Sequence, residues 1–126
     1  MPEPARRAYA FNRTRQLFLA RQVTVADTHW LRFRGLIGTS EHDFQKGMGL
    51  WIVPCRGVHT LAMAFPIDAI YLNREKQVVH VERNLEPWRF APLRLEAATV
   101  LEVPAGTVAE TGTEVGDQTE IEAGDR

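Results

Sequence analysis

The sequence contains a single cysteine, Cys55, and no long hydrophobic segment. One cysteine cannot form a disulfide within the chain, so a disulfide-stapled fold is excluded and a reducing cytoplasm is the expected compartment. The apolar runs are much shorter than the ~20 residues that a membrane-spanning helix needs. No membrane insertion is expected. Residues 1–15 contain arginines but no continuous apolar stretch, which disfavours a secretory signal.

A large net charge is also lacking, because the formal net charge is −1. The charges are nevertheless segregated: residues 1–34 contain seven arginines and two carboxylates, and residues 102–126 contain seven carboxylates and one arginine. The two ends are expected to be solvated or to lie against one another, and a basic face for an anionic partner is the alternative. The arginines do not alternate with aromatics expected at the surface and no reading motif is found, so no nucleic-acid partner is expected.

The remaining composition is that of a folded protein. The hydrophobic fraction is 44% and the charged fraction is 25%, both close to the average for globular proteins. A chain of 126 residues can bury a core without metal or disulfides. We therefore expect one domain over residues 1–126, without internal repeats or low-complexity linkers.

Short apolar or alternating runs, bounded by turn residues, occupy most of the chain and predict β-strands. The expected strands are 9–11, 17–19, 22–26, 48–53, 58–63, 67–72, 77–82, 98–103 and 119–122. The first two are expected to form a hairpin, and so are 67–72 and 77–82, across a polar turn. This spacing favours a mainly β fold, a compact sandwich or barrel of mostly antiparallel strands.

One short helix is predicted at 27–37, because Asp27 can cap its first turn and Gly38 can end it. Its core-facing side chains are expected to be Trp30, Leu31, Phe33 and Ile37. Residues 107–110 can form one further helical turn. The loop 83–96 contains Trp88, which is expected to pack the loop down or to roof a pocket.

The segment 55–68 holds the residues with the most chemical potential, namely Cys55, His59, Met63 and Asp68. On a strand over 58–63, His59 and Met63 share one face. Cys55 can meet His59 if the chain bends at Gly57. Independently of that bend, Cys55 can be a small buried hydrophobe. The alternative is a thiolate nucleophile, for which His59 and Arg56 are the local cations that would lower the pKa of the thiol.

The Cys55, His59 and Met63 spacing is also similar to part of a blue-copper ligand set. Same-face strand residues four positions apart are, however, separated by about 13 Å along the axis, which is too far for one shared ion. We therefore expect no metal or other cofactor, and no stoichiometric copper or zinc in the purified protein.

Asp68 lies in a run that is apolar on both faces, so its carboxylate needs a partner. The candidates are backbone N–H groups after Pro66, the guanidinium of Arg34 at the end of the predicted helix, or a ligand. The residues assigned to a polar binding pocket are Arg34, Cys55, His59, Met63, Asp68 and Trp88.

Several segments occur together in an order typical of one family. They are Arg34–Gly38, Gly47–Leu50, Cys55–Asp68, Val103–Thr107 and Gly116–Asp117. The chain resembles the bacterial and archaeal family known as domain of unknown function 192, over residues 21–121. This resemblance implies a compact, mainly β fold with one short helix and no established activity. It also implies that the cysteine is not obligatory, because other members carry Trp-Met-Lys-Asn where this chain has Cys and His-Thr.

These observations favour a small binding or accessory domain with a polar pocket. The alternatives are a hydrolase or transferase-like enzyme with a Cys55–His59 pair, a soft-metal (copper) site, and a protein–protein adaptor with an exposed apolar patch. The expected partner is a small molecule or another protein, and the sequence identifies neither. It also leaves open whether the protein is an enzyme.

Overall fold

The computed structural model describes residues 6–123, and a seven-stranded sheet organises this part of the chain. The strands are β1 (Arg7–Asn12), β2 (Leu17–Ala26), β3 (Met48–Ile52), β4 (Ile67–Leu72), β5 (Val78–Leu85), β6 (Thr99–Pro104) and β7 (Thr119–Ala123). Their spatial order is β5-β4-β6-β3-β2-β1-β7, and only the β2–β3 pair is parallel. The predicted mainly β fold and both predicted hairpins are confirmed.

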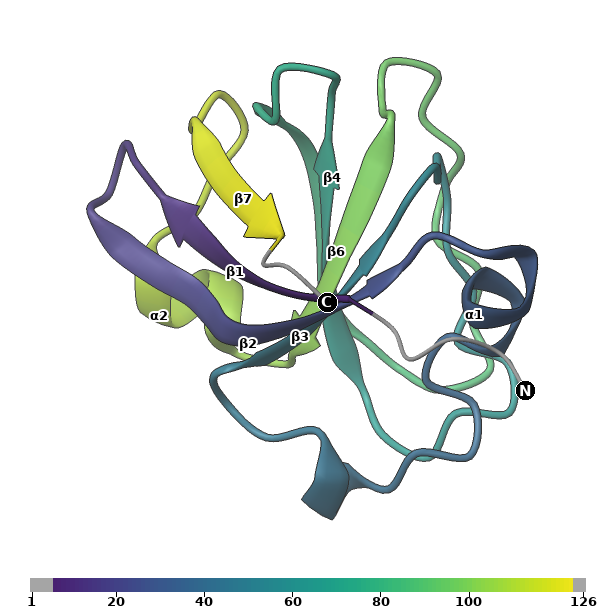
Figure 1. Ribbon diagram of the computed structural model, residues 1–126. Coiled ribbons are helices and arrows are strands. Elements are labelled where there is room, and N and C mark those ends of the chain that lie inside the picture. Colours follow the sequence, from purple (N-terminus) through teal and green to yellow (C-terminus); the bar gives the residue numbers. More distant parts are fainter. Residues whose placement is uncertain (1–5, 124–126) are drawn as a thin grey trace.

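The sheet is strongly curled, so that its two edge strands, β5 and β7, approach one another. In Figure 1 the strands diverge from the centre of the view. Backbone hydrogen bonds join Val78 at the start of β5 to Gly116 and Asp117 just before β7, at 2.8 and 2.9 Å. The inner face carries one apolar cluster with members from both edge strands, including Val78 and Ile121. The helix α2 (Thr107–Thr111) contributes Val108 to this inner cluster.

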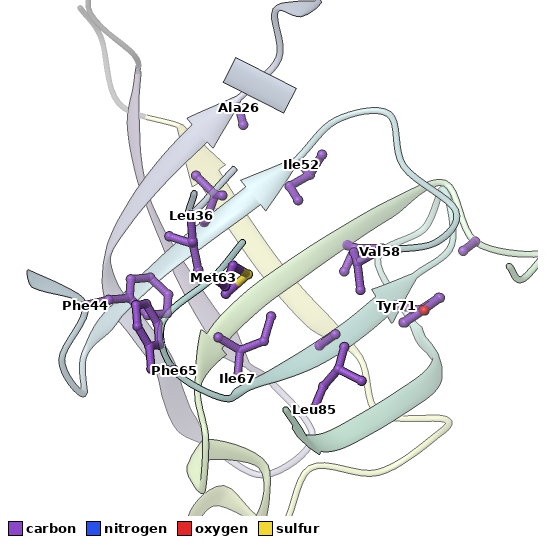
Figure 2. Close-up of a cluster of buried hydrophobic side chains, with 14 residues drawn as sticks. Ala26, Leu36, Phe44, Ile52, Val58, Met63, Phe65, Ile67, Tyr71 and Leu85 are labelled. Carbon is purple, nitrogen blue, oxygen red and sulfur yellow. The ribbon is translucent and has the colours of Figure 1, made fainter. Parts of the chain in front are cut away.

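A second apolar cluster covers the outer face of the sheet, where helix α1 (His29–Arg34) and the long loops lie. Figure 2 shows this cluster, in which the Phe44 and Phe65 rings stack with centroids 5.8 Å apart. Leu36 and Met63 lie between these rings and Ile52 of β3 (Figure 2). A 3₁₀ turn (Glu41–Asp43) precedes Phe44.

The predicted helix is shorter than expected and uses a different cap. It spans His29–Arg34 and not 27–37, and the hydroxyl of Thr28 accepts the Leu31 N–H at 3.1 Å. Asp27 instead accepts the Arg6 guanidinium at 2.6 Å. Gly35, with φ of +50°, ends the helix after less than two turns.

The predicted core face of that helix is also partly wrong. Trp30 and Phe33 are 57% and 70% exposed, whereas Leu31 packs against the outer cluster and Ile37 is half-buried. The buried side chain is Leu36, which lies beyond the helix end. A helix of six residues presents too short a face to bury every apolar side chain that the pattern contains.

The strand predicted at 58–63 does not form. Ala62 adopts a left-handed φ of +61°, and the Met63 N–H bonds back to the Thr60 carbonyl, so the chain turns there. The alternation of Val58, His59 and Thr60 is real, since only His59 is exposed. It reflects pairing with another loop, and the shared face assigned to His59 and Met63 is therefore wrong.

The other predicted strands are confirmed with small shifts of their ends. Segments 17–19 and 22–26 belong to one continuous strand, β2, and the helical turn predicted at 107–110 is α2. Within residues 6–123, no helix combines the length and apolar character needed to cross a membrane.

Candidate functional site: a cleft beside helix α1

A cleft with a volume of about 620 Å³ opens on the outer face of the sheet. Helix α1 and the turn after it form one wall, the segment 54–59 forms the other, and Ile52 and Glu102 lie at its base. Leu93 of the β5–β6 connection completes the mouth. The cleft thus lies where three non-strand segments meet over the sheet.

The wall at 54–59 is held in place by the connection between β5 and β6. Backbone hydrogen bonds of 2.8–2.9 Å join Cys55 to Ala98, Arg56 to Arg94 and Val58 to Ala91. Thr60 is fully buried, and its hydroxyl donates to the Glu86 carbonyl and accepts the Arg89 N–H. The two loops are thus joined by backbone hydrogen bonds, as neighbouring strands would be, although neither loop forms a regular strand.

Three arginines and two histidines line the cleft, against a single carboxyl group. Arg32 and Arg34 come from α1, which also supplies His29, and Arg56 and His59 come from the opposite wall. Arg32 and Arg34 form no ion pair with any other residue in the range 6–123. The mouth therefore carries uncompensated positive charge.

The carboxyl group is that of Glu102, a site residue that the sequence prediction missed. Glu102 lies in the middle of β6, opposite Leu50 of β3 and Ala69 of β4, and is only 3% exposed. Its side chain has no hydrogen-bond partner among the described residues, and burial alone raises its pKa to about 8. An acidic residue inside an otherwise apolar strand was the available sequence signal.

Cys55 lies in the same cleft but is not paired with His59. Its thiol donates a hydrogen bond to the Gly57 carbonyl at 2.9 Å. Burial raises the pKa of this thiol, the nearby Glu102 carboxylate raises it further, and the Gly57 bond and Arg32 only partly oppose these effects. His59 is exposed, and its Nδ1 accepts the Leu61 N–H at 3.3 Å. This geometry does not activate the thiol as a nucleophile.

We expect Cys55 to react slowly with iodoacetamide at pH 8, because little of it is thiolate and the sulfur is half-buried. A Cys55→Ser/Ala64→Cys variant, with its cysteine on an exposed loop position, provides the matched control. Rates followed by mass spectrometry should be several-fold lower for Cys55. Equal rates, or faster alkylation of Cys55, would restore the nucleophile hypothesis.

The arrangement does not assemble the copper ligand set either. Met63 is 5% exposed and packs in the outer cluster, whereas His59 is exposed, and its ring lies 6.3 Å from that of Phe90 between centroids, at an angle of 57°. In the part of the chain that the structure describes, no three His, Cys, Asp or Glu side chains gather closely enough to bind a metal. Metal-free protein remains a prediction, which elemental analysis of the purified protein can test.

Four of the six predicted pocket residues, Arg34, Cys55, His59 and Met63, line the cleft. Asp68 and Trp88 do not. Asp68 is buried, and its carboxylate accepts backbone N–H groups from β5 and from the start of α2, so it pairs neither with Arg34 nor with the N–H groups after Pro66.

Trp88 is 65% exposed, so it neither roofs the cleft nor packs its loop down. Its φ of +65° turns the backbone, and its N–H bonds to the Thr60 carbonyl at 2.9 Å. The hydroxyl and backbone of Thr60 therefore perform the anchoring that the sequence prediction assigned to Trp88.

The oppositely charged ends of the chain meet on the other side of the molecule. Arg15, in the β1–β2 turn, contacts Asp117 at 2.9 Å, and Asn12 donates to the same carboxylate at 2.9 Å. The prediction that the ends lie against one another is confirmed for these residues. This polar cluster ties the first hairpin to the turn before β7.

Comparison with known proteins agrees with this fold. A model of the DUF192 family, described as an uncharacterized group, matches residues 10–121. The chain belongs to the DUF192 family. A UPF0127 protein of Thermococcus sibiricus is 30% identical over 116 residues, covering 88% of this chain and 73% of that protein. A UPF0127 protein of Pyrococcus furiosus is 34% identical over 106 residues, covering 79% and 85%.

Two solved structures resemble this DUF192 protein in fold, each at 19% sequence identity. One is a protein of unknown function from Novosphingobium aromaticivorans, with a TM-score of 0.76 over 90% of this chain and 83% of that chain. The other is from Sinorhizobium meliloti, with a TM-score of 0.79 over 95% and 97%, and its description proposes a transcription regulator. At this identity the likeness establishes the fold alone.

One premise of the nucleic-acid prediction is wrong in the structure. Trp88 and Phe90 are 65% and 75% exposed and flank Arg89, so aromatic and basic side chains do alternate at the surface. The absence of a nucleic-acid partner remains a prediction. A salt-dependent binding assay with single-stranded DNA can test it.

Proposed function

We propose that this DUF192 protein is a binding module for small organic anions with an apolar body, which occupy the cleft beside α1. The observation that carries this proposal is the uncompensated charge of Arg32 and Arg34 at the mouth of a cleft of about 620 Å³. Ligand sites of this size generally combine apolar walls with a few convergent polar groups. A guanidinium is the natural partner for a carboxylate or phosphate.

The apolar part of the ligand is favoured by the rest of the lining. Ile52, Val58 and Met63 supply aliphatic surface inside the cleft. Phe33 and Leu93 line its mouth and remain 70% and 68% exposed. A ligand that covers such side chains gains about 25 cal/mol for each Å² of apolar surface removed from water.

Cys55 and His59 are assigned to ligand contact here and not to catalysis. The thiol bonds to a backbone carbonyl and its pKa is raised by burial, which supports a polar wall residue. Asp68 and Trp88 fall outside the proposed site, because neither lines the cleft.

The test compares octanoate, octanamide and octylammonium, which share one alkyl chain and differ in the charge of the head group. We expect octanoate to raise the melting temperature, because an anion that binds only the native state stabilises it by about 2.7 kcal/mol at 100 times its Kd. The neutral amide should bind more weakly. Octylammonium should give no shift.

A double variant, Arg32→Gln/Arg34→Gln, should lose most of the octanoate effect. Arg74→Gln, which removes an exposed arginine in the turn between β4 and β5, is the matched control and should keep it. Equal stabilisation by all three compounds, no stabilisation by any, or an undiminished response of the double variant would each refute the anion-binding proposal.

A further inference from the structure

Glu102 is the one carboxyl group in the cleft, and it lies where a ligand must approach the sheet. It is 3% exposed, and no donor or acceptor from residues 6–123 contacts its side chain. Buried polar groups in native proteins are nearly always hydrogen-bonded, to protein, to water or to a ligand, so this side chain must find its partner inside the cleft. Glu102 lines the cleft, so its carboxyl group is available to a hydrogen-bonding group of whatever occupies the cleft.

The surroundings of Glu102 favour its neutral form. Its neighbours across the sheet, Leu50 and Ala69, are apolar and provide no charge. The pKa of Glu102 is raised to about 8 by burial, with no opposing contribution from the arginines of the mouth. At pH 7 the group is therefore mainly a carboxylic acid, which can donate one hydrogen bond.

We propose that Glu102, as a neutral carboxylic acid, donates a hydrogen bond to an uncharged acceptor, such as a carbonyl oxygen, at the end of the ligand that enters the cleft first. This inference rests on the anion-binding function proposed above. The ligand would then have an anionic head at the arginines, an apolar body, and a carbonyl at its far end. An oxo acid has these three parts.

Other titratable or charged groups also face the cleft, so the test must separate their effects from that of Glu102. They are His29, Arg32 and Arg34 on α1, and Cys55, Arg56 and His59 on the opposite wall. The guanidiniums stay charged up to high pH. Glu102→Gln keeps all six groups, retains a donor in its amide, and removes only the titration of residue 102.

The experiment measures the Kd of octanoate and of 7-oxooctanoate, its analogue with a ketone at the penultimate carbon, by calorimetry from pH 7 to pH 9.5. At pH 7 the native protein should bind the keto acid about tenfold more tightly, the equivalent of one net hydrogen bond. That advantage should disappear as the pH rises above about 8. Glu102→Gln should keep the advantage at every pH, and Glu102→Leu should lack it at every pH.

A Cys55→Ser variant removes the titration of the thiol. It alters the Kd of both acids, because Cys55 lines the cleft, but the advantage of the keto acid over octanoate should still disappear above about pH 8. If octanoate binds but the keto acid has no advantage, or the advantage does not depend on pH in the native protein, the role of Glu102 is refuted and the anion site stands. If neither acid binds, the proposed function itself fails. The pH series on the native chain gives this result even if a variant does not fold.

Discussion

Glu102→Gln should make the unliganded protein markedly more stable at pH 9 while changing its stability little at pH 5. In the folded chain the pKa of Glu102 is raised from 4.5 to about 8, so the folded state holds its proton more tightly than the unfolded state does. Stability from such a group is fully present below the unfolded pKa and is lost as the pH rises toward the folded value. Glutamine does not titrate and avoids this loss.

The size of the effect follows from the displacement of the pKa. A shift of this size corresponds to roughly 5 kcal/mol, and hydration through the open cleft reduces it, so we expect about 2–4 kcal/mol at pH 9. Urea denaturation of both proteins at pH 5, 7 and 9 measures the difference directly. Glu75→Gln, on an exposed turn, is the control and should show no such trend. A Glu102→Gln gain that does not depend on pH would mean that Glu102 is ionised in the native state.

The strands were predictable because their signals are local. Ile67–Leu72 and Thr99–Pro104 are apolar runs bounded by turn residues, and both form central strands of the sheet. The parallel pairing of β2 with β3 was not predictable in the same way. It depends on the crossover through α1 and Phe44, which hydrophobic periodicity alone does not describe.

The failures in the site have a physical cause as well. The alternation at Val58, His59 and Thr60 predicted a strand, but it arises from pairing with residues 89–91, which lie about 30 positions away. The pattern gave no sign of the left-handed turn at Ala62. As a consequence the cleft contains four of the six residues assigned to it.

Glu102 and Asp68 present the same signal in sequence, a single carboxylate within an apolar strand. They differ only in what surrounds them, because the N–H groups that satisfy Asp68 come from residues 84, 106 and 108. No comparable donor reaches Glu102. The role of a buried carboxyl group, in holding the fold or in binding a ligand, therefore depends on whether backbone N–H groups from residues far away in the sequence reach it.

Replacing Asp68 should strongly destabilise the fold without involving the cleft. Its Oδ1 accepts the Asn84 N–H at 2.8 Å, and its Oδ2 accepts the N–H groups of Gly106 and Val108 at 3.1 and 2.9 Å. The carboxylate thus joins β4 to β5 and caps the first turn of α2, whose own cap residue is a glycine without a side chain. Three backbone N–H groups therefore depend on one carboxylate that is 1% exposed, and the Val108 N–H among them is fully buried.

Asp68→Ala leaves these donors without an acceptor. An unsatisfied buried group such as the Val108 N–H costs about 1–3 kcal/mol, and the part-buried N–H groups of Asn84 and Gly106 cost less. Partial relaxation reduces the total, so we expect a loss of about 3–4 kcal/mol in the free energy of unfolding. Asp68→Asn keeps one oxygen and directs an amide N–H₂ at the remaining donors, so about 2 kcal/mol should be lost. Asp43→Asn, on an exposed 3₁₀ turn, should stay within about 0.5 kcal/mol of the native protein.

Denaturant unfolding at pH 7 compares the three variants, and hydrogen exchange locates the effect. Protection should be lost first at Asn84, Gly106 and Val108, the residues whose N–H groups bond to Asp68. Octanoate affinity per folded molecule should not change, because Asp68 lies outside the cleft. If Asp68→Asn is as stable as the native protein, the three hydrogen bonds cannot be what makes a buried carboxylate tolerable at the centre of β4.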